Sequence, residues 1–307
     1  MNDYLPVVSI GMPVYNGADR MRRALDSILA QDFNEFELFI SDNGSTDGTL
    51  GICEEYAARD SRITYYQRDR NYGISDNFDF SASRATGKYF MWVHDDDQWE
   101  PNFIATLVRE LESDPQAGLV MCGIQRLRED ASLHDIIRFT GTDDPGNLNY
   151  LSLAQKVAAG WRNKKHYHLF MFSLFRTKLF MGANPYLSYD VPHPDRIFMC
   201  QFALATKWRY IDEVLYGRTI HQQPHTERLS EDKQNQMINS DNWGYTKTTV
   251  ALGKYLMHSG VIPWHRKVLI PLVVLSMARA YGLSLYRGRT PIVCRMAIGL
   301  IRWFKSH

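Results

Sequence analysis

Short apolar runs alternate with amphipathic stretches along the first third of the chain. Val7 to Met12 is a β-branched apolar run closed by Pro13, which is typical of a buried strand, and Arg20 to Ala30 places apolar side chains at helical spacing. The same pattern predicts strands at Glu37 to Ser41, Ile63 to Gln67 and Tyr89 to Val93, and helices at Thr49 to Arg59 and Ser75 to Ala85. This alternation predicts an α/β fold with a doubly wound, mostly parallel sheet that binds ligands at the carboxyl ends of its strands.

The pattern is less regular in the second half of the chain. Strands are expected at Leu119 to Gln125 and Leu169 to Arg176, with a polar stretch rich in glycine and proline at 130–150 between them. A helix is expected at Asp195 to Thr206, followed by short strands at Tyr210-Ile211 and Val214-Leu215. From about Trp243 the chain is expected to be helical and basic.

Composition excludes several classes of protein. A chain of 307 residues with 45% hydrophobic and 22% charged residues can bury a large core, which excludes disorder and a coiled coil. The four cysteines lie far apart without a CxxC pair, so we expect reduced thiols in the cytosol. The N-terminus does not have the pattern of a secretory signal, and the longest apolar run, Val268 to Ala278, is shorter than the roughly 20 residues of a membrane span. The Walker A and GxGxxG fingerprints are absent.

Charge is unevenly distributed along the chain. The formal net charge is only +1, but no acidic residue follows Asp241, whereas ten lysine and arginine residues do. Arg295, Arg302 and Lys305 fall on one face of a predicted helix that also carries Trp303, and Val268 to Leu275 is a second apolar element with basic neighbours. We expect this extension to bind an anionic membrane surface rather than nucleic acid, for which no recognition module is present. Packing of the basic extension on the acidic remainder is the alternative.

Three consecutive acids, Asp95, Asp96 and Asp97, follow the predicted strand at Tyr89 to Val93. Adjacent carboxylates repel one another unless a cation neutralises them, which is an argument for a metal site. Taken alone, three consecutive aspartates favour a solvated acidic turn, and it is the polar sets after the other strands that shift the balance toward a metal site. Further polar sets follow other strands, at Pro13-Val14-Tyr15-Asn16, at Asp42-Asn43-Gly44 and at Asn71-Tyr72-Gly73. Together they offer an aromatic face for a base, acceptors for base and ribose, and a divalent cation for a diphosphate.

With these motifs the chain resembles the inverting family 2 glycosyltransferases of the GT-A fold over about residues 7–104. The resemblance implies a nucleoside site, a metal site and Mn²⁺ or Mg²⁺ as cofactor. The implied nucleotide-binding residues are Pro13, Val14, Tyr15, Asn16, Asp42, Asn43, Asn71, Gly73, Asn77 and Asp95, and the implied metal ligands are Asp96, Asp97 and His221. Asp96 aligns best with the family's metal-binding carboxylate, and Asp95 and Asp97 are flanking candidates for ribose or metal contact.

The chain departs from the family pattern at three places. The acidic turn has Asp42-Asn43 where the family often has two aspartates, so either one or both of these residues contact the base. His94 replaces the first acid of the common DxDD motif. The family's frequent Ala-Arg-Asn is missing after Gly73, so no diphosphate-binding arginine is assigned there.

A weaker resemblance continues into the second half. By position Asp195 is the catalytic base that deprotonates an acceptor hydroxyl, with Asp190 as the fallback and a helix cap as the alternative role. His221 follows Arg218 in the family's Arg-x-His-like element, and His193 and His225 are its rivals as metal ligand.

The resemblance thus implies a metal-dependent inverting glycosyltransferase that uses a nucleotide sugar, with UDP as the expected nucleotide. The expected acceptor is a lipid-linked oligosaccharide or a cell-surface polysaccharide precursor at the cytoplasmic face of the cell membrane. We expect a catalytic domain at 1–225, with a nucleotide-sugar half at 1–104 and an acceptor half at 105–225, and a helical basic extension at 226–307. The alternative is a non-catalytic sugar-nucleotide-binding or scaffold protein that retains the fold.

Overall fold

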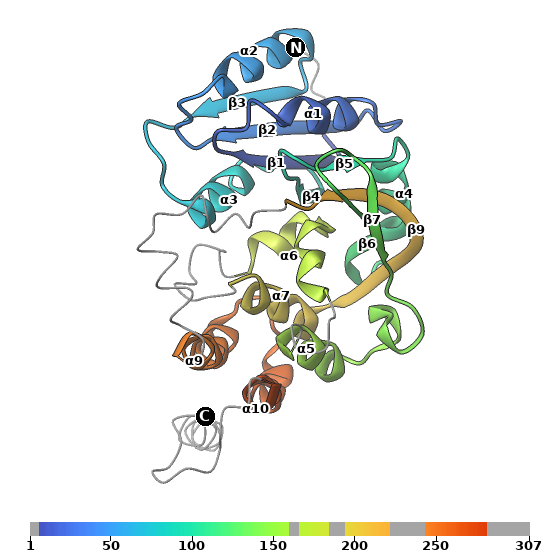
Figure 1. Cartoon of the computed structure of the whole chain (residues 1–307). Coiled ribbons are helices and arrows are strands. Elements are labelled where there is room, and N and C mark those ends of the chain that lie inside the picture. Colours follow the sequence, from blue (N-terminus) through green and yellow to red (C-terminus); the bar gives the residue numbers. More distant parts are fainter. Residues whose placement is uncertain (1–5, 160–165, 184–193, 222–242, 281–307) are drawn as a thin grey trace. The chain divides into compact units, whose positions relative to one another are not determined.

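The computed structural model describes residues 6–159, 166–183, 194–221 and 243–280 (Figure 1). These residues divide into two compact units. The first is formed by 6–146, 172–181 and 208–221, and the second by 147–159, 166–171, 182–183, 194–207 and 243–280. Both units are built from segments that are discontinuous in the sequence. The expected domain division at residue 225 stays a prediction.

Four parallel strands form the N-terminal part of the first unit. They are β1 (Val8–Val14), β2 (Phe36–Asp42), β3 (Ile63–Gln67) and β4 (Tyr89–Trp92), in the spatial order β3-β2-β1-β4. Every residue of β1 is buried, because the strand has neighbours on both sides and helices on both faces. The sequence therefore predicted these strands as apolar runs, and the structure confirms all four.

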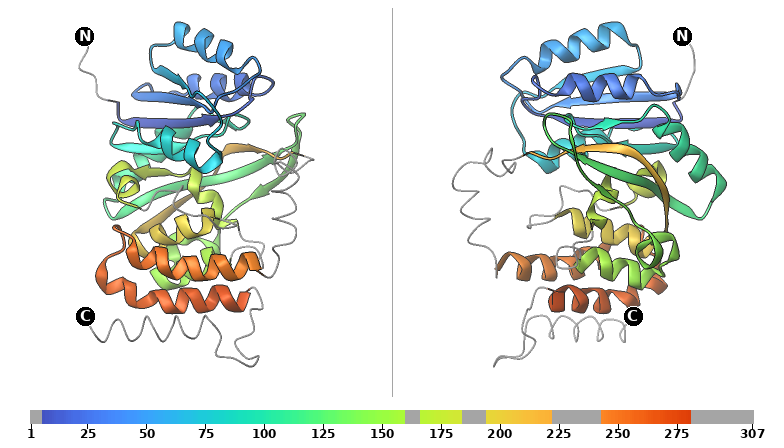
Figure 2. Two further views of the ribbon diagram at one scale, coloured as in Figure 1. Left: turned by 90° about the vertical axis from the view of Figure 1, so that its left-hand side faces the viewer. Right: turned by 45° about the vertical axis from the view of Figure 1, so that its right-hand side comes forward.

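The helices between these strands cover both faces of the sheet. They are α1 (Met21–Leu29), α2 (Thr49–Arg59) and α3 (Ile74–Ala82). A right-handed crossover places α1 and α2 on one face, whereas the return from β3 to β4 runs in the other direction and places α3 on the opposite face. Figure 2 shows α1 and α3 on opposite sides of the strands. The doubly wound α/β fold expected from the sequence is confirmed.

Antiparallel strands extend the sheet beyond β4. They are β5 (Gln98–Trp99), β6 (Ala117–Leu127), β7 (Leu133–Ile137), β8 (Leu174–Arg176) and β9 (Lys207–Thr219), and the order continues β4-β8-β6-β9-β5 with β7 paired to β6. The helix α4 (Phe103–Ser113) packs against β6, and α6 (Thr177–Met181) follows β8. The described sheet has nine strands, of which the parallel strands β1 to β4 form one end.

Three expectations for the second half were wrong in detail. Leu169 to Arg176 is a strand only from Leu174, because Tyr167–Phe172 forms the 3₁₀ helix η3. The polar stretch at 130–150 contains the strand β7, which pairs with β6 and was not predicted because most of its side chains are exposed. The short 3₁₀ helices η1 (Gly141–Asp143) and η2 (Pro145–Asn147) follow it. The two short strands expected near 210 and 214 form one continuous strand, β9.

The second unit is helical. It contains α5 (Tyr150–Ala159), α7 (Pro194–Ala205), α9 (Trp243–His258), the 3₁₀ helix η6 (Trp264–Leu269) and α10 (Ile270–Ala280). α7 packs against α5 and α9, and α10 packs against the same two helices. Residues Arg196 to Leu204 of α7 are all buried, which makes α7 the centre of this unit.

Two of the ten cations that follow Asp241 contact helix ends within this unit. Arg266 donates to the carbonyls of Leu204 and Ala205 at 3.1 and 2.9 Å, at the C-terminus of α7. Lys267 donates to the carbonyl of Met257 at 2.7 Å, near the end of α9. A cation at a helix C-terminus satisfies carbonyls without an intrahelical partner and opposes the negative end of the helix dipole. These two charges therefore stabilise the helical unit itself.

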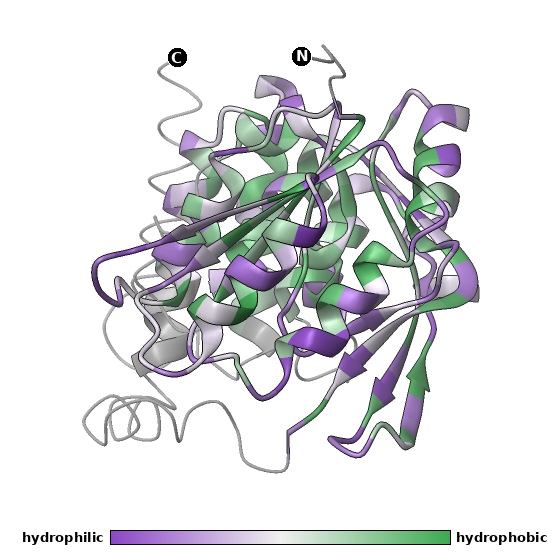
Figure 3. Ribbon diagram, turned by 90° about the horizontal axis from the view of Figure 1, so that it is seen from above, coloured by the Kyte–Doolittle hydropathy of each residue, from purple (hydrophilic) through white to green (hydrophobic). Residues whose placement is uncertain are grey.

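Figure 3 shows hydrophobic residues concentrated on the strands and on one face of the helices. Hydrophilic residues lie mainly on the other face of the helices and in the loops. Among the described helices, none combines the length and the apolar composition that a bilayer crossing needs. The expected amphipathic helix with Arg295, Arg302, Trp303 and Lys305 lies outside the described residues.

Candidate functional site

The carboxyl ends of β1, β2 and β4 meet at one edge of the sheet. The register pairs Val14 with Asp42 and Gly11 with Trp92. The backbone of Asn43 then donates to the carbonyl of Val14 at 2.9 Å, so the strand-end segments remain side by side beyond the strands. Segments that are far apart in the sequence are thereby brought to one place, as the strand pattern predicted.

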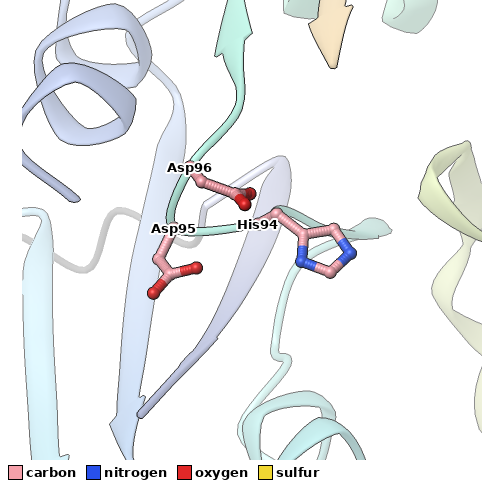
Figure 4. Close-up of side chains that lie close together, drawn as sticks. All are labelled: His94, Asp95 and Asp96. Carbon is pink, nitrogen blue, oxygen red and sulfur yellow. The ribbon is translucent and has the colours of Figure 1, made fainter. Parts of the chain in front are cut away.

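Three consecutive side chains of the loop after β4 form a candidate cation site. His94, Asp95 and Asp96 each offer a ligand atom, and these atoms lie within 4.8 Å of one another (Figure 4). Both aspartates are buried. Burial, together with the neighbouring charge of Asp96, raises the pKa of Asp95 to about 7. A divalent cation at this place relieves both the desolvation and the repulsion.

Two arginines, Arg20 just before α1 and Arg23 within it, contact the acidic loop. Arg20 donates to Oδ2 of Asp95 at 2.7 Å, and both side chains are largely buried. Arg23 donates to the backbone carbonyl of Asp96 at 3.0 Å and to the hydroxyl of Thr219 at 2.8 Å. The ion pair with Arg20 therefore holds the loop at the start of α1, and the hydrogen bonds of Arg23 connect the loop with β9.

Asp97 accepts hydrogen bonds from β9 with both carboxylate oxygens. The backbone N–H of Thr219 donates to Oδ1 at 2.9 Å, and the hydroxyl of Tyr216 donates to Oδ2. Pairing of β5 with β9 sets Tyr216 opposite Trp99, on which its ring stacks. Burial and the charge of Asp96 raise the pKa of Asp97 to about 7. Asp97 is thus a link between the loop and β9.

His221, which follows β9, reaches the acidic loop from 125 residues away in the sequence. Its Nε2 lies 2.6 Å from Oδ2 of Asp96, and its Nδ1 lies 2.8 Å from Oε1 of Glu129. The hydrogen bond to Asp96 and the one to Glu129, against the effect of partial burial, raise the pKa of His221. The imidazole therefore bridges two carboxylates, one of them in the candidate cation site.

Asp42 ends β2 with one of its carboxylate oxygens available. Its Oδ1 accepts a hydrogen bond from the backbone of Ser45 at 2.9 Å, whereas Oδ2 is buried without a hydrogen-bond partner in the described part of the chain. Gly44 turns the chain here with φ +74°, and an added Cβ would lie 2.7 Å from the backbone of Arg70. This turn therefore needs a glycine, and it fixes the position of the Asp42 carboxylate.

Asn43 uses its side chain to hold the neighbouring loop. Its Nδ2 donates to Oδ1 of Asn71 at 2.9 Å and to the carbonyl of Gly73 at 3.1 Å, and its Oδ1 accepts from the backbone of Tyr72 at 3.1 Å. The side chain is buried. Asn43, Asn71 and Gly73 are thereby brought together, with the ring of Tyr72 40% exposed.

Asn77 fastens α3 to the ends of β1 and β2. Its Nδ2 donates to the carbonyls of Val14 and Ser41 at 3.2 and 3.1 Å, and its Oδ1 accepts from the hydroxyl of Ser41 at 2.5 Å. Its carboxamide is therefore occupied within the protein.

The segment after β1 presents an aromatic ring at the same edge. Pro13 and Val14 are buried, whereas Tyr15 is 42% exposed. Asn16, with φ +48°, accepts from the backbone of Thr46 at 2.9 Å and so ties this segment to the turn after Asp42. The exposed ring of Tyr15 offers a stacking face at the edge of the sheet where β1 and β2 end.

Arg218 is a half-buried cation on β9, three residues before His221. Within the described chain its guanidinium faces the ring of Phe172, 5.8 Å away, and makes no hydrogen bond, and its charge acts on Asp97 and Tyr216.

Asp195 lies in the other unit, in the first turn of α7. Asp190, His193 and His225, its fallback and the rivals of His221, lie outside the described residues. Sequence reasoning did not assign Arg20, Tyr216 or Glu129 to the site, and gave His94 no role as a ligand. No local signal marks the first three, because each acts on a residue at least 75 positions away.

Comparisons with known proteins identify relatives of parts of this chain. A family model described as "Glycosyl transferase family 2" matches residues 9–181. An uncharacterised glycosyltransferase of Rickettsia typhi is 36% identical over 125 residues, 40% of this chain and 38% of the relative. Chondroitin synthase of Pasteurella multocida is 25% identical over 217 residues, 71% of this chain and 21% of the synthase. The chain spans less than two fifths of the Rickettsia relatives.

Solved structures show the same fold at low sequence identity. TarS 1–349 of Staphylococcus aureus, in complex with UDP-GlcNAc, aligns with a TM-score of 0.62 at 15% identity, covering 97% of this chain and 80% of TarS 1–349. The mannosyltransferase PcManGT of Pyrobaculum calidifontis, in complex with GDP-Man and Mn²⁺, aligns with a TM-score of 0.53 at 18% identity, covering 99% and 81%. These likenesses confirm the expected GT-A fold.

The hydrogen bonds of Asn43 lead to a test of its role. In Asn43→Asp the new carboxylate cannot donate to Asn71 or to the carbonyl of Gly73, so we expect the free energy of unfolding to fall by about 1–3 kcal/mol. Urea denaturation measures the change. The exposed Asn34→Asp is the matched control, since Asn34 only accepts a hydrogen bond. Equal stability of the two variants would show that Asn43 does not hold the loop.

Proposed function

We propose, from the fact that this chain belongs to glycosyl transferase family 2, that it transfers a sugar from a uridine diphosphate sugar to a hydroxyl of an acceptor with inversion at the anomeric carbon. The chain is a glycosyltransferase, and its relatives of known fold bind nucleotide sugars. The observation that carries the proposal is that two features lie at one sheet edge: the Asp42 carboxylate, whose Oδ2 has no hydrogen-bond partner among the described residues, and the cluster of His94, Asp95 and Asp96.

The cation is proposed to bind at Asp96, with His221 as the second ligand and His94 and Asp95 beside them. Carboxylate and imidazole form a donor set that suits Mn²⁺, and the PcManGT structure contains Mn²⁺. When bound, the cation stabilises the charge that develops on the nucleoside diphosphate as the sugar leaves. Asp97 contributes negative charge while it anchors β9, and Asp95 remains the candidate for ribose contact.

The buried oxygen of Asp42 supports a base that presents an N–H group. An unpaired buried acceptor is unfavourable by about 1–3 kcal/mol, and a donor on the ligand removes this penalty. Uracil presents N3–H on its hydrogen-bonding edge, whereas cytosine presents an acceptor at the same position. Stacking on the exposed ring of Tyr15 supplies the second contact. Pro13, Val14, Asn16, Asn43, Asn71, Gly73 and Asn77 are proposed to shape this nucleotide site.

Arg218 is proposed to contact the diphosphate. Its guanidinium is close enough to affect Asp97, and no hydrogen bond to a described residue holds it. It takes the role of the arginine that the chain does not have after Gly73, because a guanidinium binds phosphate oxygens in a forked geometry.

Asp195 is proposed as the general base. Its place in the first turn of α7, behind Pro194, exposes it to the positive end of the helix dipole, which favours the ionised carboxylate that a base needs. One base and a single displacement give an inverted product. Because Pasteurella chondroitin synthase is a relative over 71% of this chain, a polysaccharide precursor or lipid-linked glycan is the proposed acceptor.

The helical unit is proposed to bind the inner surface of the cell membrane. Trp264, Val268 and Leu272 follow one another at intervals of four residues and are 81%, 51% and 45% exposed. Exposed apolar side chains in a segment without acids are typical of an interfacial helix. Since Arg266 and Lys267 hold helix ends, the attraction to anionic lipid is assigned to the other cations of the extension.

Asp96→Asn tests the metal site. The change removes a charge and little volume, so we expect the fold to persist and the Mn²⁺-dependent part of UDP binding to be lost. Calorimetric titration with UDP, with and without MnCl₂, measures it, and Asp32→Asn, an exposed aspartate on a loop, is the control. Manganese-dependent affinity that is equal in both variants would place the cation elsewhere.

Asp195→Asn tests the base. Donor binding should stay near that of the wild type, whereas turnover falls by about 10²–10⁴-fold, the usual contribution of a general base. Release of UDP from the donor in the presence of acceptor measures turnover, and calorimetry measures donor binding on the same sample. Turnover equal to that of the wild type would show that Asp195 is not the general base and serves only at the helix end.

Replacing Trp264, Val268 and Leu272 by serine tests the membrane proposal. We expect the triple variant to bind anionic vesicles more weakly in flotation assays at low salt, because the apolar contact is lost while the charge is kept. The control is Leu133→Ser with Ile136→Ser, which removes two exposed apolar side chains from β7. Equal flotation of both variants and the wild type would contradict the proposed surface.

A further inference from the structure

The tip of the β6–β7 hairpin reaches the candidate metal site through one side chain. Glu129 lies in the turn, two residues after the end of β6, and its Oε1 lies 2.8 Å from Nδ1 of His221, 92 residues away in the sequence. The opposite nitrogen of the same ring, Nε2, lies 2.6 Å from Oδ2 of Asp96. The two ring nitrogens thus point to two different carboxylates, only one of which belongs to the acidic loop.

The backbone around this contact is fixed on both sides. The N–H of Ile220 donates to the carbonyl of Leu127 at 2.8 Å, which joins the residue before His221 to the strand end that precedes Glu129. Within the turn, the N–H of Arg128 donates to the carbonyl of Ser132 at 2.9 Å. Ala131 completes the turn with φ +63°. Glu129 therefore projects from a defined hairpin rather than from a free loop.

Below the turn, an ion pair braces the hairpin. Arg126 on β6 contacts Asp135 on β7 with two nitrogens, one of them 2.6 Å from Oδ1, and the two residues are register partners. The side chain of Arg128 also donates to the carbonyl of Leu133 at 2.7 Å. These contacts leave Glu129 as the residue of the turn that faces His221.

The chemistry of imidazole gives this contact a function. A histidine binds a metal through a nitrogen without a proton, so the other nitrogen must carry the hydrogen, and an acceptor placed at that nitrogen fixes the tautomer and the ring orientation. Glu129 accepts at Nδ1, which leaves Nε2 as the nitrogen directed at Asp96.

We infer that Glu129 is a positioning residue of the metal site, which accepts a hydrogen bond from the Nδ1–H group of His221 and so holds Nε2 ready to bind the cation together with Asp96. The inference rests on the metal site of the proposed function. The side chain of Glu129 is 56% exposed and that of His221 only 15%, so Glu129 is the more exposed partner of this contact. Loss of an exposed carboxylate has little effect on folding, and its effect on metal binding can therefore be measured separately.

Titration of Mn²⁺ in the presence of saturating UDP, followed by electron paramagnetic resonance, tests the inference. We expect Glu129→Ala to weaken Mn²⁺ binding by about 10–100-fold, the usual effect of removing the partner of a metal-binding histidine. Glu129→Gln should recover part of the affinity, because its amide oxygen still accepts the hydrogen bond. Glu54→Ala, an exposed glutamate of α2, is the matched control and should bind Mn²⁺ as the wild type does. UDP binding in EDTA should be equal in all these variants.

A double-mutant comparison separates positioning from long-range charge. If Glu129 acts through the imidazole, Glu129→Ala has no further effect in a His221→Ala background. Wild-type Mn²⁺ affinity in Glu129→Ala, no recovery in Glu129→Gln, or the same loss with and without His221 would each overturn the inference. Failure of the proposed function looks different, since then the wild type binds no Mn²⁺ or Asp96→Asn binds it unchanged.

Discussion

Three carboxylates at the end of a buried strand repel one another, and much of the first unit is arranged around this repulsion. Asp95 pairs with Arg20 of the first helix region, Asp96 faces His221, and Asp97 accepts hydrogen bonds from Tyr216 and Thr219. Each partner comes from a distant segment, so the acidic loop joins the parallel strands to β9. Even with these contacts, burial and the charge of Asp96 raise the pKa of Asp95 and of Asp97 to about 7. A divalent cation at the proposed site would offset the repulsion between these carboxylates.

The sequence was sufficient to predict the parallel half of the fold. Buried parallel strands appear as short apolar runs between amphipathic helices, and Ile63–Gln67 and Thr49–Arg59 were predicted with their observed bounds. The antiparallel half was harder, because apolar runs there belong to 3₁₀ helices as well as to strands. The run from Leu169 to Arg176 contains both. β7 was missed because its exposed positions, such as Leu133, do not alternate clearly with buried ones.

The sequence was sufficient to predict that the candidate site lies at the strand ends. It was not sufficient to predict which contacts each side chain makes there. The carboxamides of Asn43 and Asn77 donate to the protein's own loops and strands, so these residues hold the strand ends in place at the proposed nucleotide site. Asp42 keeps one buried oxygen free among the described residues. Glu129 had no signal at all in the sequence, since only the pairing of β6 with β7 brings that turn toward His221. The same limit applies to Arg266 and Lys267, whose contacts with helix ends depend on the packing of the second unit.

Anomalous diffraction from crystals grown with UDP and Mn²⁺ tests the central claim most directly, that the acidic loop and His221 together form a cation site for a nucleoside diphosphate. The account predicts a manganese peak in contact with Asp96 and Nε2 of His221, with the uracil beside Asp42 and the diphosphate between the base and the cation. A peak away from both ligands, or bound UDP without any manganese at the acidic loop, would contradict it.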